Sequence, residues 1–445
     1  MAGGIWLSQN KKRPGAYINF KSVPRSTMTV GDRGIVAIGL PLKWGKEDEL
    51  IEVLSSSLMD GLSKKLIGFD AFDEDSKLLS GALSYAYKAL VYRMDRGGSK
   101  ATATIGNLTI TAKYNGTLGN KILIAIKSSQ NGLFDVITYL NGEVIDTQRV
   151  STISELEDND FVDFSFETDS VPEENAGTAL SGATDGTVTE SAIYSSMLKV
   201  LKMAHWQTFA CTSSDVTTKS NVVDFITQLR NDEGRYVQAV VADYDGADFE
   251  GIINSINGCI IDGVSYSKEE FTAIVAGMTA GANFNQSNTA KKVKGATQII
   301  GELDDNEIKE ALQSGKFILS TSAKGEIKVE QDINSLHTFT KDKDYNFSKN
   351  RVIRTLDEIG TTTKLTWEET YMGKVDNNAT GRGLFKGDLI SYGNELQRLS
   401  GIQEFNGADD ITVSQGNDLD SVVVDWTIKP VDSMEKLYMT VNVRG

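Results

Sequence analysis

The side chains best suited to catalysis are scarce in this sequence. His205 and His337 are its only histidines, and they stand far apart along the chain. His205 follows the helical stretch LKVLKMA, so we expect a helix-terminal or core histidine rather than a catalytic base. Cys211 and Cys259 are the only cysteines, and neither a CxxC nor an HExxH motif occurs. The sequence therefore gives little support to a transition-metal site, and it excludes a disulfide framework.

Two short segments partly match ligand-binding loops. DYDGADFE, from Asp243, resembles part of a calcium loop, but Gly246 comes too early for the EF-hand pattern. GRGLFKG, from Gly381, has one residue too many for a dinucleotide-binding GxGxxG motif. No GxxxxGK[ST] phosphate loop is present. We predict a turn at a strand end for the first segment and a flexible turn for the second.

These observations assign no catalytic residue, no metal ligand and no cofactor. A pair of carboxylates could support hydrolysis, but with 61 aspartates and glutamates such a pair is easy to propose. A nucleophilic triad stays open because its members can be far apart in sequence. We therefore expect a non-enzymatic protein.

The composition narrows the possible partners. The chain has 445 residues, a net charge of −16 and no dense basic run, which argues against direct binding to nucleic acid. No window approaches 18 consecutive apolar residues, so we expect no membrane insertion. The N-terminal stretch lacks the pattern of a secretory signal, and the low cysteine content suits a reducing cytoplasm.

The elements that would carry these side chains alternate between strand and helix patterns. The segment RGIVAIGLPLKWG, from Arg33, predicts a buried strand, and residues 47–65 and 76–90 predict helices. Ser267 and Glu270 form a capping box before a helix with one apolar face. Such alternation predicts an α/β layer with a partly parallel sheet.

A different composition interrupts that layer. Residues 101–166 contain recurring Thr-, Ile- and Val-rich runs, and Asn131-Gly132 and Asn141-Gly142 are hairpin turn signals. We predict an all-β domain inserted into the α/β core, and we expect a short Gly/Ser linker to be able to replace residues 101–183. The predicted divisions are residues 1–25, an extended arm; 26–99 and 185–334, the two parts of the core; 100–184, the inserted domain; and 335–445, a C-terminal α+β domain.

The two ends of the chain carry short apolar pieces. Near the N-terminus, Gly and Pro separate Ile5–Leu7 from Tyr17–Phe20. The C-terminal domain shows helix patterns near Ser348 and Asp388, with Lys386-Gly387 before the second, and then the strand patterns ITVSQ, SVVVDWTIKP and KLYMTVNV. A strand at the very end of a chain holds only where a sheet is already available, its own or that of a neighbouring chain.

The terminal segments resemble those of the contractile tail sheath proteins of tailed phages and phage-like particles, including R-type bacteriocins and defective prophages. The similarity lies in GGIWLSQNKKRPGAYINF and RGIVAIGLPLKWG, in the segment from KFILSTSAKG to RTLDEI, and in GNDLDSVVVDWTIKPVDSMEKLYMTVNV. These motifs are structural, and their order spans nearly the whole chain.

This resemblance implies stacked hexameric rings around an inner tail tube. The sheath would contract from a metastable extended state and drive the tube through a target cell envelope without nucleotide hydrolysis. The implied partners are other copies of the chain, the tube protein, and baseplate and tail-terminator proteins. The implied location is the tail of a virion or phage-like particle assembled in the host bacterial cytoplasm. The residues predicted to contact neighbouring subunits are Ile5, Trp6, Leu7, Tyr17, Ile18, Phe20, Trp426, Leu437, Met439, Val441 and Val443.

Two alternatives remain at this point. The Thr/Gly-rich module would also fit a non-catalytic surface or adhesin-like β protein, although such proteins are exported and no export signal is visible. A hydrolase with an acidic site is the other alternative.

Overall fold

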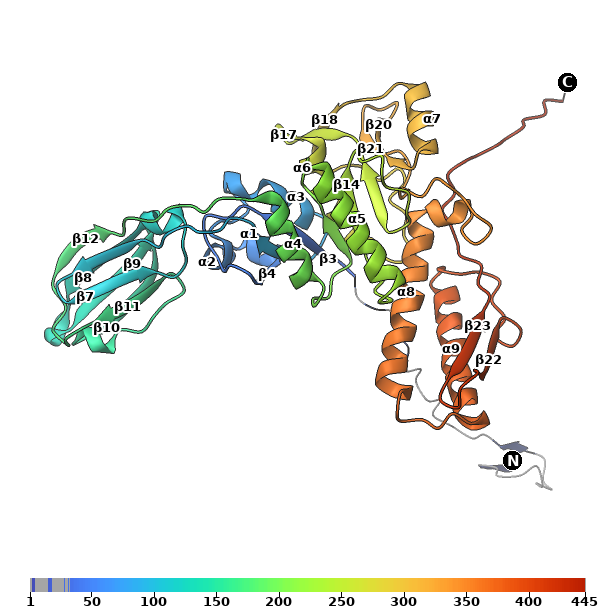
Figure 1. Ribbon diagram of the computed structural model, residues 1–445, viewed down its shortest axis with the longest axis horizontal. Coiled ribbons are helices and arrows are strands. Elements are labelled where there is room, and N and C mark those ends of the chain that lie inside the picture. Colours follow the sequence, from blue (N-terminus) through green and yellow to red (C-terminus); the bar gives the residue numbers. More distant parts are fainter. Residues whose placement is uncertain (1, 5–14, 18–27, 29–30, 32, 445) are drawn as a thin grey trace. The chain divides into compact units, whose positions relative to one another are not determined.

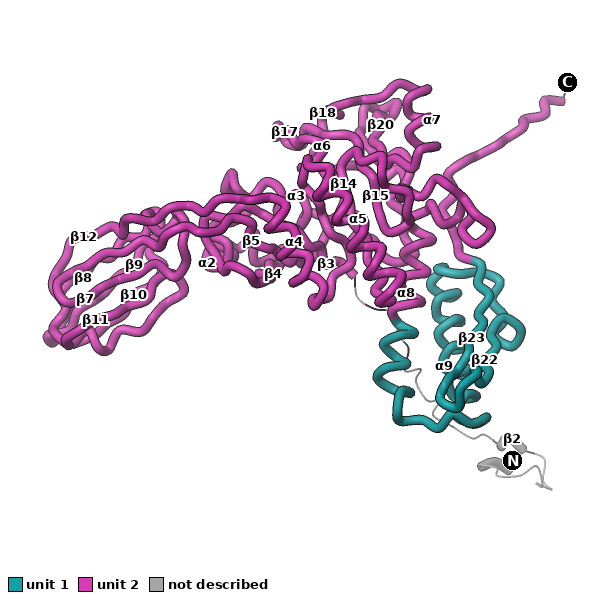
Figure 2. The backbone as a smooth tube through the Cα atoms, viewed as in Figure 1, with its two compact units in different colours: residues 1–30, 362–429 teal, residues 31–361, 430–445 magenta. Residues whose placement is uncertain are grey.

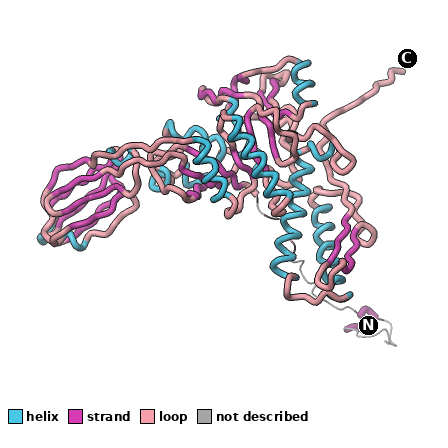
Figure 3. Tube along the Cα trace, viewed as in Figure 1, coloured by secondary structure: helices cyan, strands magenta, loops and turns pink. Residues whose placement is uncertain are grey.

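A computed structural model describes residues 2–4, 15–17, 28, 31 and 33–444. The chain forms two compact units: residues 31–361 with 430–445, and residues 1–30 with 362–429 (Figure 2). We call the first the large unit and the second the small unit. The predicted fold class is confirmed, because α/β, all-β and mixed α+β parts are all present (Figure 3).

The large unit contains a seven-stranded sheet in the order β19-β15-β14-β13-β3-β5-β4 (Figure 1). Neighbouring strands are parallel except β4, which is antiparallel to β5. The strands are β3 (Ile35–Leu40), β4 (Leu50–Leu54), β5 (Lys88–Arg93), β13 (Thr208–Ala210), β14 (Gln238–Ala242), β15 (Ile252–Ser255) and β19 (Lys316–Phe317).

Both faces of this sheet are buried, as expected for parallel strands. Val36 and Ile38 of β3 belong to one apolar cluster with Phe271 of α6, whereas Ala37 belongs to the opposite cluster with Ile226 of α5. The predicted capping box of α6 is present, since Ser267 and Glu270 bond each other's backbone. The helices are α1 (Ser55–Met59), α2 (Lys64–Ile67), α3 (Lys77–Leu83), α4 (Glu190–Leu201), α5 (Val216–Asn231), α6 (Lys268–Ala280) and α7 (Asp305–Gln313), with 3-10 turns η1 (Glu74–Ser76) and η5 (Tyr345–Ser348).

The helix predicted for residues 47–65 is wrong. Leu50–Leu54 forms β4, which pairs with β5, and only short helices follow. Ile51 and Val53 are buried while Glu52 and Leu54 are exposed, which is the period-two pattern of an edge strand. The helix predicted for residues 76–90 is shorter than expected, because Lys88 already belongs to β5.

The inserted region is a two-sheet β-sandwich. Its sheets have the orders β10-β9-β8-β12 and β11-β7-β6, and their inner faces share one apolar core. The elements are β6 (Thr102–Ile105), β7 (Leu108–Ala112), β8 (Ile122–Ser128), β9 (Phe134–Leu140), β10 (Glu143–Val150), β11 (Val162–Phe166) and β12 (Asn175–Ala179), with the 3-10 turns η2 (Thr117–Lys121), η3 (Gln130–Gly132) and η4 (Ile153–Glu155).

Two smaller sheets complete the large unit. They are the three-stranded sheet β17-β16-β18 and the hairpin β20-β21. Their strands are β16 (Gly258–Ile261), β17 (Val264–Tyr266), β18 (Ala296–Ile300), β20 (Leu319–Thr321) and β21 (Ile327–Val329). Helix α8 (Asn350–Thr366) begins in the large unit and ends in the small one.

The small unit consists of helices and a hairpin. The end of α8 continues into the π-helical turn η6 (Trp367–Tyr371), and α9 (Ala379–Arg398) precedes the hairpin of β22 (Ile411–Gln415) and β23 (Val422–Trp426). A short parallel pair, β1 (Ala2–Gly4) with β2 (Gly15–Tyr17), is assigned to the same unit.

The flexible turn predicted at GRGLFKG is wrong, because this segment lies within α9. The Asn378 side chain accepts a hydrogen bond from the Gly381 backbone N–H at 2.9 Å and begins the helix there, well before Lys386-Gly387. A Cβ at Gly381 would lie 2.0 Å from the Asp376 carbonyl oxygen, so this glycine permits a close backbone approach.

Candidate functional site

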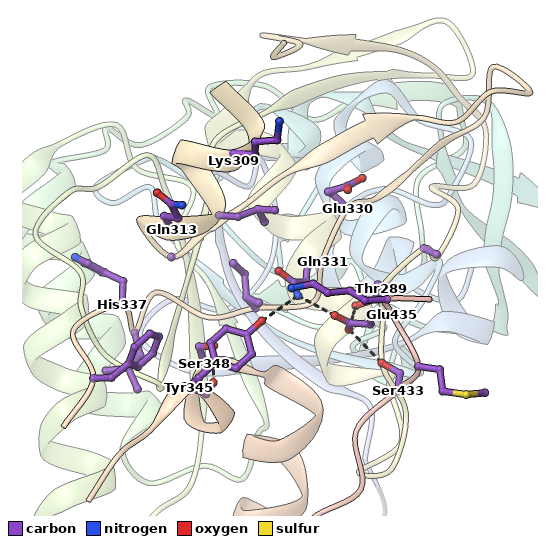
Figure 4. A pocket seen from close by; sticks show the side chains of 18 of the residues that line it. Thr289, Lys309, Gln313, Glu330, Gln331, His337, Tyr345, Ser348, Ser433 and Glu435 are labelled. Atoms are coloured by element: carbon purple, nitrogen blue, oxygen red, sulfur yellow. Dashed lines mark hydrogen bonds between the residues drawn. The ribbon is translucent and has the colours of Figure 1, made fainter. Parts of the chain in front are cut away.

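The best-defined polar site outside the core lies in the C-terminal segment of the large unit, residues 430–445. The Glu435 Oε1 atom accepts hydrogen bonds from Thr289 Oγ1 at 2.7 Å and Ser433 Oγ at 3.1 Å. Its Oε2 atom accepts a hydrogen bond from Gln331 Nε2 at 2.7 Å (Figure 4). The same atom also accepts a hydrogen bond from Lys349 Nζ. We call residues 432–436 the arm root and residues 437–444 the C-terminal arm.

The ion pair at the arm root is removed from water. The Lys349 side chain is 3% exposed and that of Glu435 is 12% exposed, and Asp432 Oδ2 lies 3.4 Å from Lys349 Nζ. Burial alone raises the pKa of Glu435, but the hydrogen bonds from Lys349, Gln331 and Thr289 outweigh it, so this pKa lies below its ordinary value. Glu435 is therefore ionised at neutral pH and bound through both carboxylate oxygens.

A second set of buried groups connects the arm root to helix α8. Thr289 Oγ1 accepts a hydrogen bond from the Asp332 backbone N–H at 2.9 Å. The Asp332 carboxylate in turn accepts from Asn350 Nδ2 at 2.9 Å and from Arg354 Nη2 at 2.6 Å. Asn350 and Arg354 lie in the first two turns of α8, so the arm root is fixed to the start of this helix.

A pocket of about 610 Å³ adjoins the arm root (Figure 4). Its lining includes the polar residues Lys309, Gln313 and Glu330 and the apolar residues Leu312, Ile333, Leu336 and Phe339.

The C-terminal arm has the opposite character to its root. Leu437, Met439, Val441 and Val443 are 70% to 90% exposed. The arm forms no helix or strand within the described chain and is drawn as an extended trace (Figure 1). The alternating apolar pattern is therefore present, but a strand partner for it is absent among the described residues, and a strand within the single chain is not formed.

An open sheet edge exists in the small unit. Strands β22 and β23 pair only with each other among the described residues, so each has one free edge. A two-stranded sheet is marginal by itself, and unpaired edge groups can accept a further strand.

Trp426 occupies a different setting from the other predicted contact residues. It ends β23, and its ring centroid lies 6.3 Å from that of Tyr392 and 6.1 Å from that of Phe405. Tyr392 is fully buried in the small unit. Trp426 therefore packs the hairpin onto α9, and a role of its exposed part in subunit contact stays a prediction.

The predicted N-terminal contact residues are described only in part. Tyr17 is the last residue of β2, which pairs in parallel with β1. Ile5, Trp6, Leu7, Ile18 and Phe20 lie outside the described residues.

The residues considered for catalysis have other partners. His205 Nε2 lies 3.2 Å from Gln207 Nε2, and burial together with Arg235 and Lys88 lowers the pKa of His205. His337 Nδ1 lies 2.8 Å from the Ser335 carbonyl oxygen. The two histidines have separate partners and form no catalytic pair.

The calcium-like segment is a turn at a strand end, as predicted. Asp243 follows β14 with a φ of 46°, and its Oδ2 atom is 2.7 Å from Lys268 Nζ. Asp245 Oδ1 is 3.0 Å from Lys316 Nζ, so both carboxylates are paired with lysines. Within the described part of the chain, no group of three or more His, Cys, Asp or Glu side chains could hold a metal ion. Among the described helices, none is both long and apolar enough to cross a membrane.

Sequence reasoning missed the arm root. Apart from Ser433, the partners of Glu435 precede it by 86 to 146 positions, and no local pattern marks such a contact. Two features could have drawn attention to it: Lys349 stands at the start of a predicted helix, and Glu435 immediately precedes the alternating apolar run.

Three family models match successive parts of the chain. Residues 96–185 match the phage tail sheath protein beta-sandwich domain, residues 187–335 match the central domain of the same protein, and residues 342–444 match the phage tail sheath C-terminal domain. The β-sandwich and the arm root with its arm thus fall within matched regions.

Similar proteins extend the match to the full length. The phage-like element PBSX protein XkdK of Bacillus subtilis is 33% identical over 478 residues and covers all of both chains. The crystal structure of a sheath tail protein from Desulfitobacterium hafniense is 38% identical, with a TM-score of 0.81 over 96% of this chain and 99% of that one.

A more distant structure shares the fold. The helical sheath of the anti-feeding prophage in its contracted state is 9% identical and has a TM-score of 0.58, over 97% of this chain and 99% of that one. The chain is a structural subunit of the kind that builds the tails of phages and phage-like particles, and it belongs to the phage tail sheath protein family.

Proposed function

We propose that this chain polymerises as stacked hexameric rings around an inner tail tube and contracts from a metastable extended state. Contraction would drive the tube through a target cell envelope. The tube protein, the baseplate and a tail-terminator protein would be the other partners, and assembly would take place in the host bacterial cytoplasm. Family membership and the fold shared with a contracted sheath support this function.

The observation that carries the proposal is the exposed C-terminal arm. Its four alternating apolar side chains lie in water in the single chain. Burying them would stabilise a complex by roughly 1.5–3 kcal/mol each, which nearly offsets the roughly 1–2 kcal/mol per residue needed to order the strand. The arm would then form a strand only beside a sheet edge that is already in place.

A second copy of the chain offers such an edge. The β22–β23 hairpin has one free edge on each strand among the described residues. We assign the arm of one subunit to an edge of this hairpin in a neighbouring subunit, by strand addition. The N-terminal contact residues, Ile5 to Leu7 and Tyr17 to Phe20, would serve the same purpose.

The remaining assignments follow from this function. The energy for contraction would come from rearranged subunit contacts, so we propose no catalysis and no nucleotide binding. We also propose that residues 26–99 and 185–334 form one α/β core, with 100–184 as an inserted all-β domain and 335–445 as a C-terminal α+β domain that carries the terminal arm.

Negative-stain electron microscopy of the purified protein tests the proposal. We expect rings or tubes with sixfold symmetry, and we expect a chain that ends at Lys436 to give only dispersed particles. Tubes formed by this truncated chain would contradict the role of the arm, and dispersed monomers of the full chain under all conditions would contradict the function itself.

A further inference from the structure

We propose that Glu435 is the positioning residue of the C-terminal arm: its buried contacts fix the direction in which the arm leaves its own subunit. This inference rests on the proposed function, because it concerns how a strand donor is presented to its acceptor. Strand pairing within the single chain does not fix the direction of the arm, because the arm has no strand partner among the described residues.

Glu435 is a largely buried side chain within an otherwise exposed stretch of chain. Glu435 is largely buried and bound through both carboxylate oxygens, whereas Leu437, two positions later, is 84% exposed. Met434, on the other side, is fully exposed as well. The arm root is therefore attached by a side chain and not by apolar packing.

The contacts of Glu435 come from separate parts of the fold. Thr289 follows α6, Gln331 follows β21 and Lys349 directly precedes α8. Lys349 is itself held, because its backbone forms a bridge with Ile333. A carboxylate bound from three directions cannot slide along the surface, so the attachment defines one exit point.

The charges at the arm root favour the pairing of Lys349 with Glu435. Lys349 is 3% exposed and has two carboxylates within 4 Å, those of Glu435 and Asp432. Removal of Glu435 would leave a buried cation with the more distant and more exposed Asp432 alone. A buried cation that loses its main partner is costly, so the folded chain favours the anchored arm.

A fixed exit matters for assembly because it lowers the entropy lost when the arm is ordered on a neighbour. A preorganised segment binds more tightly than the same segment on a loose tether. We therefore expect a loosened arm root to raise the critical concentration for tube formation by about tenfold.

Spin-label distance measurements test the inference directly. Cys211 and Cys259 are fully buried, so labels can be directed to cysteines introduced at Tyr438 in the arm and at Lys324 in the β20–β21 turn. We expect a narrow distance distribution in this parent protein and a clearly broader one after Glu435→Ala. Glu49→Gln, which removes the charge of an exposed ion pair with Lys46, is the matched control and should leave the distribution unchanged.

A second variant separates positioning from stability. Glu435→Ala can destabilise the large unit by leaving Lys349 unpaired, whereas Lys349→Met with Glu435→Ala removes both charges. We expect the double variant to recover the thermal midpoint but to keep the broad distribution and the raised critical concentration measured by sedimentation.

The possible outcomes are distinguishable. A broad distribution in the parent, or a narrow one in both Glu435 variants, would overturn the positioning role. If the chain ending at Lys436 forms no tubes while Glu435→Ala assembles like Glu49→Gln, only this inference fails. If the truncated chain still forms tubes, the proposed function of the arm fails instead.

Discussion

Asp332 shows how single buried residues hold the network beneath the arm root. It is 1% exposed, and its carboxylate accepts hydrogen bonds from Arg354, Asn350 and the Asn288 backbone N–H. Burial alone raises the pKa of Asp332, but the Arg354 charge and these hydrogen bonds outweigh it and lower the pKa below its ordinary value.

The first prediction concerns this carboxylate and pH. A lowered folded-state pKa contributes stability that is present above the ordinary Asp pKa of about 4 and is lost as pH falls below it. We expect Asp332→Asn to lower the free energy of unfolding by roughly 3–5 kcal/mol at pH 7, because Arg354 then keeps a buried charge without its carboxylate. Urea unfolding at pH 7 and pH 3.5 measures both effects: the difference between variant and parent should shrink at the lower pH.

Asp342→Asn is the control for that experiment, since Asp342 is exposed. Equal stability of parent and Asp332→Asn at pH 7 would show that the buried pair contributes nothing.

The second prediction concerns Val441 in the arm. Val441 is 70% exposed in the single chain, so Val441→Asp should change the free energy of unfolding by no more than about 0.5 kcal/mol. The same change should block tube formation, because a carboxylate would be placed on the apolar face of the donated strand. Thermal melting and sedimentation measure the two effects separately.

Asn442→Asp provides the matched control, since it adds the same charge on the opposite face of the strand. Tube formation by Val441→Asp at the level of this control would contradict strand donation.

At the scale of elements, aromatic packing and hydrogen bonds join the β-sandwich to the core. Trp44 is fully buried, with its ring centroid 5.2 Å from that of Tyr114 and 5.8 Å from that of Phe161. Arg93 donates to Asn115 Oδ1 at 2.8 Å and pairs with Asp95 at 2.6 Å. Removal of the β-sandwich would therefore expose Trp44 and take away a hydrogen-bond partner of Arg93.

The third prediction modifies the expectation that residues 101–183 can simply be replaced by a short Gly/Ser linker. We still expect the shortened chain to fold and assemble, but at a lower thermal midpoint. Exposure of Trp44 alone should lower the free energy of unfolding by roughly 1.5–3 kcal/mol. Adding Trp44→Ser to the shortened chain should reduce its aggregation in sedimentation runs. Complete loss of a cooperative circular dichroism melt would contradict the inserted-domain interpretation.

The fourth prediction concerns the N-terminal segment. Its apolar pieces are short and separated by Gly and Pro, so it has little to fold on alone. We expect removal of residues 1–20 to leave a stable monomer that forms no tubes, as measured by thermal melting and sedimentation. Long tubes formed by the shortened chain would show that these residues do not link subunits.

At the scale of the whole molecule, the question is where the energy for contraction comes from. The sequence has no phosphate loop, and its net charge of −16 disfavours a polyanionic ligand. The fifth prediction is that calorimetric titration with ATP and magnesium gives no binding heat. Micromolar binding would contradict the proposal that contraction draws only on stored conformational energy.

Features determined by neighbouring residues could be predicted from the sequence. The capping box of Ser267 and Glu270, the Asn141-Gly142 hairpin turn and the apolar alternation of the C-terminal arm each depend on a few adjacent positions. Their physical causes are backbone hydrogen bonding and side-chain direction. Both act between residues that are close in sequence.

Features determined by distant partners were decided only by the tertiary structure. Leu50–Leu54 became a strand because β5 offered an edge, and position 381 in α9 requires glycine because a Cβ there would lie 2.0 Å from the Asp376 carbonyl oxygen. The contact between Glu435 and Lys349 joins residues 86 positions apart. The sequence therefore determined that the arm is apolar on one face, whereas the tertiary structure decided where it is anchored, because burial and pairing depend on segments that meet only after folding.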